Sequence, residues 1–202
     1  MPRTGTLTVA GLPFTVTEAA APCTYTLQSS SASLAAGGIS GATVSFTTSQ
    51  TGCTTSGAAV TSYANWITAS NTSSGSPGQL TYTVGVNPSG TTRKGDVQIG
   101  DPLFTITQSG AACAYSLSGY GAAFGQLGGS GSVLGSPSAE GCTPVIGTTQ
   151  PTIVSLGDLT GPVLNIFTQG YTVNAFDSLT NAIRRATITF GGQIFTIKQS
   201  SW

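Results

Sequence analysis

The amino-acid sequence predicts an all-β protein that consists of two tandem antiparallel β-sandwiches with an additional β-hairpin at the N-terminus. Three observations support this fold class. A pattern repeats at about ninety residues, short apolar runs alternate with polar residues, and the cysteines form two equally spaced pairs. Self-similarity at a domain-sized period is typical of tandem modules. Two modules of this size have room for a modest core each.

The repeat is clearest in a segment that reads as a two-stranded hairpin. Residues 93–107 resemble residues 184–198, and both resemble residues 3–17. A second element recurs at the same offset, since Cys23-Thr-Tyr25-Thr-Leu27 returns as Cys113-Ala-Tyr115-Ser-Leu117. We therefore expect sandwiches over 22–109 and 112–202, the second divergent, and an extra hairpin over 1–20.

Alternation with period two predicts strands through most of the chain. Val97–Ile99 and Phe104–Thr107 place apolar residues on one face and polar residues on the other, with Gly100-Asp101-Pro102 as a turn between them. Clusters of Gly, Ser and Pro, including 118–132 and 157–162, are expected to be turns or loops. The only candidate helix, over 176–183, is short enough to be a single turn.

The four cysteines predict one disulfide bond inside each sandwich, Cys23 with Cys53 and Cys113 with Cys142. The separations are thirty and twenty-nine residues, and matched separations in two repeats favour equivalent bonds. Four buried free thiols are the alternative. Since disulfides persist in oxidising compartments, the prediction is an extracellular or cell-surface protein of bacterial type.

Composition argues against several classes of function. The chain has no histidine, six basic and six acidic residues. It therefore cannot form a Ser-His-Asp catalytic triad, and it lacks the Cys/His ligand spacing that is typical of zinc sites. We expect no enzyme activity, no cofactor and no metal. The few basic residues argue against nucleic acid, and no apolar stretch is long enough for membrane insertion. The N-terminus lacks the apolar region of a signal peptide, so we expect a mature or excised fragment.

The motifs also carry a family resemblance. Each unit begins with Cys-x-Tyr-x-Leu and has a Gly-Cys about thirty residues later, and the first continues with Asn65-Trp66-Ile67 and Tyr82-Thr-Val84. It closes with Arg93-x-Gly95-x-Val97 and Phe104-Thr-Ile106-Thr-Gln108. This pattern resembles the BACON family of bacterial β-sandwich domains. The resemblance implies an Ig-like fold in surface or secreted proteins and an association with carbohydrate or a spacer role.

We call the strands of a sandwich that precede its last hairpin the body of that sandwich. The sequence predicts no such strands before the N-terminal hairpin, so this hairpin has no body of its own. Its apolar face would consist of Leu7, Val9, Phe14 and Val16, and an isolated hairpin is marginal in water. One interpretation is that it is the last hairpin of a preceding module. The other is that it docks on another sandwich module or on a copy of this chain, as strand addition to an exposed edge allows.

Aromatic residues are the candidates for glycan binding. Tyr63, Asn65 and Trp66 lie together beside the loop 70–78, and Tyr120 lies in a glycine-rich segment of the second module. Exposed rings stack on the apolar faces of sugars, while the alternative for Trp66 is a core position beside the first disulfide. Asn71-Thr72-Ser73 matches the N-glycosylation pattern.

Taken together, these observations favour a non-catalytic structural or adhesive module of a surface protein or filament, assembled end to end through the N-terminal hairpin. The alternative is a carbohydrate-binding module. The expected partners are neighbouring β-sandwich modules or copies of the chain, with glycans as the second candidate.

Overall fold

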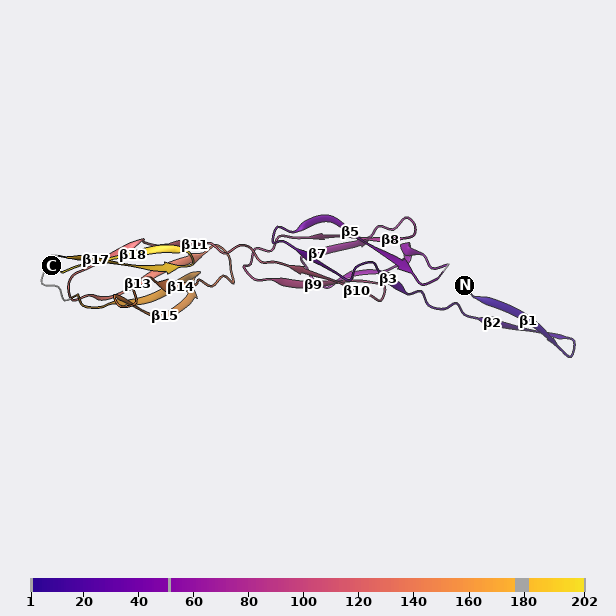
Figure 1. Ribbon diagram of the computed structural model, residues 1–202. Coiled ribbons are helices and arrows are strands. Elements are labelled where there is room, and N and C mark those ends of the chain that lie inside the picture. The colour runs from indigo at the N-terminus through magenta and orange to yellow at the C-terminus, as the bar shows by residue number, and fades with distance from the viewer. Residues whose placement is uncertain (1, 51, 177–181, 202) are drawn as a thin grey trace. The chain divides into compact units, whose positions relative to one another are not determined.

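The structure, a computed structural model, describes residues 2–50, 52–176 and 182–201, and these are almost entirely β (Figure 1). The helical element among them is one 3-10 turn, η1 (Thr55–Gly57). The chain divides into two compact units. The first unit holds Met1–Asn87 and Thr92–Gly110, and the second holds Pro88–Thr91 and Ala111–Trp202.

The first unit contains two four-stranded sheets. One sheet has the order β3 (Tyr25–Leu27), β5 (Ile39–Thr48), β8 (Gly78–Val84) and β7 (Ile67–Asn71). The other has the order β4 (Ser31–Leu34), β10 (Leu103–Gln108), β9 (Arg93–Ile99) and β6 (Val60–Ser62). All pairs are antiparallel except β4, which runs parallel to β10.

The second unit repeats this arrangement strand for strand. Its first sheet has the order β11 (Tyr115–Leu117), β13 (Gly129–Pro137), β16 (Ile166–Val173) and β15 (Val154–Val163). Its second sheet has the order β12 (Gly121–Phe124), β18 (Gln193–Ser200), β17 (Ile183–Phe190) and β14 (Ile146–Thr148). Here β12 runs parallel to β18, and the other pairs are antiparallel. The Ig-like two-sandwich fold is therefore present, with one parallel pair in each sandwich as a departure from a purely antiparallel one.

Each unit has its own core, formed by the inward residues of its two sheets. Strand alternation is visible in β8, where Leu80, Tyr82 and Val84 are buried and the residues between them are not fully buried. The first core also includes Phe46. The core of the second unit includes Val133, Val154, Tyr171, Ile188 and Phe190. Separate cores are the mark of independent folding units.

One disulfide bond lies within each unit, as the cysteine spacing predicted. Cys23 is bonded to Cys53 and Cys113 to Cys142. The Cα–Cα distance is 5.7 Å in both bonds, which is the usual separation for an unstrained cystine. Each bond joins the segment just before the first strand of a sandwich to a later loop, which follows β5 in the first unit and β13 in the second.

Several glycine-rich segments form strands, although their composition indicated turns. Residues 121–124 form β12, residues 129–132 begin β13, and residues 157–162 lie inside β15, which has two register irregularities against β16. Strand propensity is weak evidence because pairing with neighbouring strands overrides it. The candidate helix over 176–183 falls mostly on residues 177–181, which lie outside the described residues.

The N-terminal hairpin consists of β1 (Arg3–Val9) and β2 (Leu12–Glu18), which pair only with each other among the described strands. Its two-residue turn has Ala10 at a φ of 52° and Gly11 at a φ of 82°. Two successive positive φ values are typical of a type I′ turn, whose twist matches that of the flanking strands.

Candidate functional site

The candidate site is best understood from the hairpins that complete the two sandwiches. We call β9–β10 and β17–β18 the closing hairpins, because each is the last hairpin of its unit and occupies the centre of a sheet. In both, the inward residues are almost completely buried. They are Val97, Ile99, Phe104 and Ile106 in the first unit, and Ile188, Phe190, Phe195 and Ile197 in the second.

An arginine and a buried glutamine hold each closing hairpin to its body, and we call this arrangement the clasp. In the first unit Arg93 Nε donates to Gln108 Oε1 at 2.9 Å. Gln108 Nε2 donates to the backbone carbonyls of Ala36 and Gly85, both at 3.0 Å, and of Ala35 at 3.3 Å. The Gln108 side chain is completely buried, and these bonds satisfy both ends of its amide.

The second unit has the same clasp. Arg184 Nε donates to Gln199 Oε1 at 2.8 Å, and Gln199 Nε2 donates to the carbonyls of Gly125, Asn174 and Gln126 at 3.0, 3.1 and 3.3 Å. Each arginine also lies over an aromatic ring. Arg93 Cζ is 4.2 Å from the centre of the Trp66 ring, and Arg184 Cζ is 4.5 Å from that of Phe176.

The N-terminal hairpin has the register of a closing hairpin. Arg3 pairs with Glu18 as Arg93 pairs with Gln108 and as Arg184 pairs with Gln199. Leu7 pairs with Phe14, which corresponds to Val97 with Phe104 and to Ile188 with Phe195. The hairpin is therefore a third copy of the closing element, in structure as well as in sequence.

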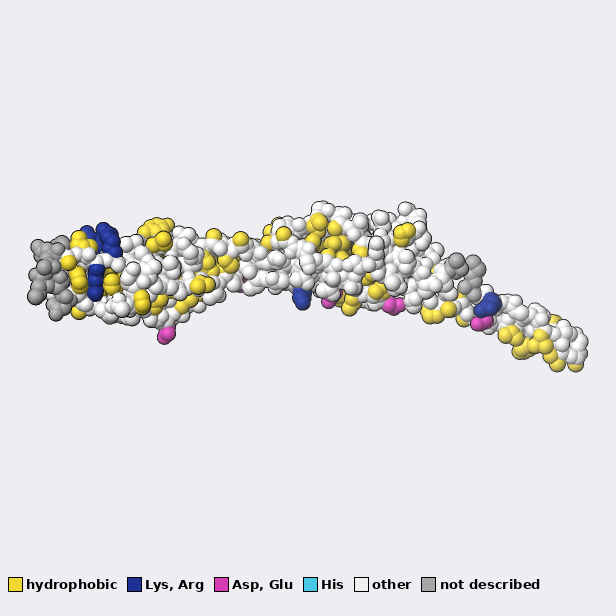
Figure 2. Space-filling model, viewed as in Figure 1, with side chains coloured by type: hydrophobic (Ala, Val, Ile, Leu, Met, Phe, Trp, Pro, Cys, Tyr) yellow, Lys and Arg dark blue, Asp and Glu magenta, His cyan; other side chains and the backbone are white. Residues whose placement is uncertain are grey.

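The apolar face of this third copy is uncovered, as Figure 2 shows along residues 3–18. Leu7, Val9, Phe14 and Val16 are 50%, 58%, 59% and 51% exposed, whereas their counterparts in the closing hairpins are no more than 6% exposed. Burying such a side chain stabilises by about 1.5–3 kcal/mol. The structure thus places these four predicted residues on one exposed apolar surface of the hairpin.

The predicted glycan platform of the first unit is only partly assembled. Tyr63 is 62% exposed, and its hydroxyl donates to Gln98 Oε1. Asn65 is exposed, but Trp66 is half-buried and packs on the core beside Gly95, under Arg93. The guanidinium occupies a ring face that a sugar would need. Trp66 thus packs against the core of the first unit and contacts Arg93, and Gly95 leaves room for its ring.

Tyr120, the fourth predicted platform residue, belongs to the second unit. It is 64% exposed, and it precedes β12, whose Phe124 packs on the core of that unit. The structure therefore gives each unit one exposed tyrosine near a sheet edge, rather than one continuous aromatic surface within a unit.

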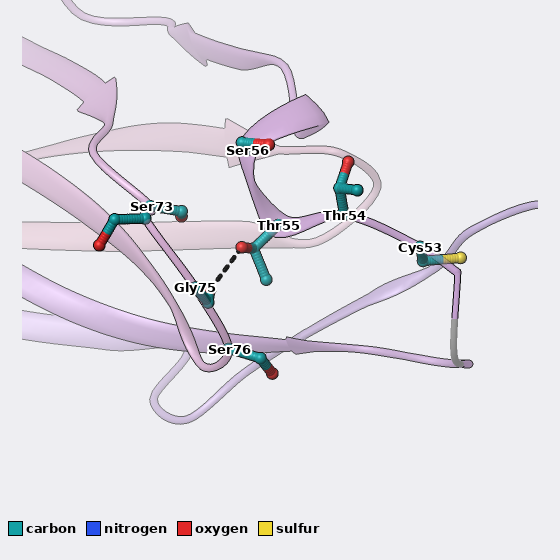
Figure 3. A pocket seen from close by; sticks show the side chains of 8 residues that line it. Cys53, Thr54, Thr55, Ser56, Ser73, Gly75 and Ser76 are labelled. Atoms are coloured by element: carbon teal, nitrogen blue, oxygen red, sulfur yellow. Dashed lines mark hydrogen bonds between the residues drawn. The ribbon is translucent and has the colours of Figure 1, made fainter.

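A hollow of the first unit lies beside the disulfide loop and has a volume of about 440 Å³ (Figure 3). Its lining consists of small polar residues, namely Cys53, Thr54, Thr55, Ser56, Ser73, Ser74, Gly75 and Ser76. Thr55 Oγ1 donates to the Gly75 carbonyl at 2.6 Å. None of these eight described residues is charged or aromatic, so they offer neither an acid for hydrolysis nor a ring for stacking.

The glycosylation motif is occupied by internal hydrogen bonds. Asn71 Nδ2 donates to the carbonyls of Thr55 at 2.7 Å and Ala58 at 3.0 Å, and its Oδ1 accepts from the Ser73 backbone N–H at 3.0 Å. The amide nitrogen that a glycan would occupy is thus a structural donor between β7 and η1.

The acidic residues that the structure describes do not form a metal-binding group. No group of three or more His, Cys, Asp or Glu side chains within 2–50, 52–176 and 182–201 could hold a metal ion. Asp96 lies in β9 of the first closing hairpin and accepts a hydrogen bond from Thr105 Oγ1 of β10 at 2.7 Å. In the part of the chain that is described, no helix is long and apolar enough to cross a membrane.

Two core tyrosines have perturbed ionisation. Burial raises the pKa of Tyr82 and of Tyr171 above the ordinary value of 10.0, because the phenolate is poorly solvated in the core. Tyr82 packs on Phe104 and Tyr171 on Phe195, with ring centroids 5.2 and 5.8 Å apart. Both rings therefore join a central strand to a closing hairpin.

Comparisons with known proteins identify no relative by sequence, since neither a family model nor a curated protein matches the chain. Solved structures with a similar arrangement include the I9–I11 tandem of titin, at 10% identity and a TM-score of 0.35, with 97% of this chain and 73% of that one covered. The Yersinia pseudotuberculosis adhesin InvE is 11% identical with a TM-score of 0.43, and the match covers 89% of this chain and 58% of that one. Domains 4–9 of the surface-layer protein SbsC are 14% identical with a TM-score of 0.30, and the match covers 100% of this chain and 35% of that one. These values carry no argument about function.

Proposed function

We propose that the chain is a non-catalytic extracellular module with a structural or adhesive role in a surface protein or filament, and that residues 3–18 join it end to end to a neighbouring β-sandwich. One observation carries the proposal. The N-terminal hairpin has the register of a closing hairpin, while its four apolar side chains are at least half exposed. A partner that covers this face would gain the burial that both closing hairpins already have.

Other features support parts of the proposal. The two disulfide bonds support a location in an oxidising compartment. The absence of histidine from the sequence and the small polar lining of the hollow beside Cys53 support a non-catalytic role. Membership of the BACON family would agree with these features, and it rests on the sequence motifs alone.

The joint would be directional. The hairpin and the surface that receives it are different surfaces, so the contact is heterologous. Heterologous contacts that repeat along a series of modules and do not close into a ring produce a linear array. This geometry suits a module whose task is to separate two ends or to extend a filament.

Hydrogen exchange tests the joint. Backbone amides of residues 3–18 should exchange quickly in the isolated chain and slowly in the native assembly from which the protein is taken. Amides of β9 and β10 serve as an internal control, because their protection should be the same in both samples. Equal exchange of residues 3–18 in the two samples would contradict end-to-end joining, and electron micrographs of the same assembly would show whether it is linear.

Carbohydrate binding is the second candidate, and the exposure of Tyr63 is the observation that favours it. A polysaccharide array probed with the full chain and with Tyr63→Ala decides between the two. Binding that Tyr63→Ala abolishes and Tyr120→Ala preserves would support a glycan site in the first unit. Absence of binding to all polysaccharides would remove this candidate.

A further inference from the structure

The N-terminal hairpin differs from the closing hairpins at two inward-facing points. We infer that it fits a third kind of β-sandwich body, distinct from both bodies of this chain, which presents a side chain smaller than tyrosine to Ala10 and a hydrogen-bond donor to Glu18. This inference rests on the proposed function in one respect, namely that the hairpin is an assembly element. It names the chemistry of the partner and excludes a second copy of this chain as the body that the hairpin completes.

The first difference is at the turn. Gly100 in the first unit and Gly191 in the second begin the turns of the closing hairpins, at φ values of 60° and 54°. A Cβ added to Gly100 would overlap the ring of Tyr25, and one added to Gly191 would overlap the ring of Tyr115. These are the tyrosines of the two Cys-x-Tyr-x-Leu motifs. Close packing of this kind leaves no room for an added methyl group.

Ala10 has such a methyl group at the corresponding position. Its φ of 52° matches that of Gly191, and the following Gly11 matches Gly192 at 82° against 85°. The two turns therefore have the same shape and differ by the Cβ of Ala10. Placed on either body of this chain, the hairpin would press this atom into a tyrosine ring, so its own partner needs a smaller side chain there.

The second difference is at the clasp. Glu18 stands where the closing hairpins have Gln108 and Gln199. Each glutamine uses its amide nitrogen as a donor to three backbone carbonyls. A carboxylate has no donor, and in that place it would face three carbonyl oxygens in a buried environment. Removing hydrogen-bond partners from buried polar groups is costly, and adding a charge increases the cost.

Two other positions show that the hairpin is still shaped for a related body. Gly95 makes room for Trp66, because an added Cβ would lie 2.8 Å from Trp66 Cζ2. The second unit has Ala186 at this position and no tryptophan in the corresponding part of its sequence. The N-terminal hairpin has Gly5 there, and Arg3 where Arg93 stacks on Trp66. The partner body therefore has a large aromatic residue between these two positions, as the first unit does.

The Arg3–Glu18 pair occupies the position of a clasp and forms an ion pair. Arg3 Nε lies 3.4 Å from Glu18 Oε2, and both side chains are more than 60% exposed. In a suitable partner, arginine would retain this pair while an N–H or O–H group would meet the second carboxylate oxygen. Ala10 and Glu18 thus prevent the third hairpin from replacing the two internal ones, which would otherwise compete for the same two bodies.

The test uses the full chain, unfolded with its disulfides intact and refolded at low and high protein concentration. Four proteins are compared: wild type, A10G, E18Q and A10G/E18Q, with Thr15→Gln as a control that adds an amide to the same hairpin. Light scattering gives the mass, and hydrogen exchange reports whether residues 3–18 or the closing hairpins are displaced. None of these changes touches the core of either unit.

The wild-type chain and the Thr15→Gln control should refold as monomers with residues 3–18 in fast exchange. A10G/E18Q should form hairpin-exchanged species at high concentration, with slow exchange in residues 3–18 and faster exchange in β9–β10 or β17–β18. E18Q alone should raise the exchanged fraction roughly tenfold. Tyr115→Ala combined with E18Q should permit the same exchange in the second unit only, since it makes room from the opposite side.

Hairpin exchange in the wild type to the same extent as in A10G/E18Q would overturn the inference, as would a double variant whose hairpin stays free. These outcomes are separate from those of the proposed function. If residues 3–18 are unprotected in the native assembly, the end-to-end joint fails, whereas the comparison of refolded variants still decides whether Ala10 and Glu18 exclude the hairpin from the bodies of this chain.

Discussion

Arg93 and Gln108 face each other across β9 and β10 and share a hydrogen bond of 2.9 Å from Nε to Oε1. The acceptor beside the arginine is a neutral amide and not a carboxylate. An amide suits the surroundings of Gln108, because its nitrogen also donates to carbonyls of residues far away in the sequence. The clasp therefore depends on one side chain that both accepts from the hairpin and donates to the body.

Replacement of Gln108 by glutamate tests the clasp directly. Gln108→Glu should lower the free energy of unfolding of the first unit by about 2–3 kcal/mol, because the substitution replaces a buried amide donor with a carboxylate that faces three carbonyl oxygens. Denaturant unfolding followed by circular dichroism measures this loss. Gln79→Glu, an exposed glutamine in β8, should change it by less than about 0.5 kcal/mol. Equal effects of the two substitutions would show that the buried amide is not important.

The two glycines of the β17–β18 turn provide a matched pair. Gly191 and Gly192 have φ values of 54° and 85°, so an alanine is strained at either position, by roughly 1–2 kcal/mol. Only at Gly191 would the methyl group also meet the Tyr115 ring. Gly191→Ala should therefore destabilise the second unit by about 1–3 kcal/mol more than Gly192→Ala. Thermal unfolding distinguishes them, and equal midpoints would contradict the argument.

Each disulfide bond should stabilise only its own unit. The Cys23→Ala/Cys53→Ala variant opens a loop with a sequence separation of 30, and it should lower the stability of the first unit by roughly 3–4 kcal/mol in the chain-entropy treatment. Hydrogen exchange resolved by unit should show this loss in β3 to β10 and leave β11 to β18 unchanged. The variant that lacks Cys113 and Cys142 should show the reverse, and a loss of protection in both units from either variant would contradict separate cores.

Alkaline pH should destabilise both units through their buried tyrosines. The pKa of Tyr82 and of Tyr171 is raised above 10.0 in the folded protein by burial. The unfolded chain therefore ionises first, so the stabilisation is present below pH 10.0 and is lost as the pH rises through the folded-state pKa. Unfolding midpoints should therefore hold up to about pH 10 and fall as the pH rises further.

Phenylalanine variants provide the control for this pH dependence. Tyr82→Phe should reduce the alkaline loss in the first unit and Tyr171→Phe that in the second, because each removes one group that ionises late in the folded state. Phenolate absorbance should titrate above 10.0 for these two residues. An identical pH dependence in wild type and variants would refute the role of the buried phenols.

Local pattern was sufficient to predict the hairpins. Period-two alternation and a glycine turn specify two adjacent strands without reference to the rest of the chain, and the structure confirms β9–β10, β17–β18 and the disulfide pairs. The alternation also placed Leu7, Val9, Phe14 and Val16 on one face of the N-terminal hairpin, and the structure shows that all four are exposed.

Features that depend on distant residues were not predictable. The burial of Gln108 rests on carbonyls at Ala35 and Ala36, which are 73 and 72 residues away. The parallel pairing of β4 with β10 and the strand conformation of Gly121–Phe124 likewise depend on neighbours that no local window contains. Trp66 could be assigned to the core or to a glycan platform until Gly95 and Arg93 were seen around it.

The sequence by itself determined that this protein has two β-sandwiches, each with an internal disulfide bond, and a third copy of their last hairpin, because repeats, alternation and cysteine spacing can be read from the sequence alone. Only the tertiary structure decided what the difference between Gln108 and Glu18 means. A glutamine and a glutamate are both ordinary strand-end residues in a sequence. They become different where backbone carbonyls of loops distant in the sequence surround the side chain in a buried site, because a glutamine can donate hydrogen bonds to them and a glutamate cannot.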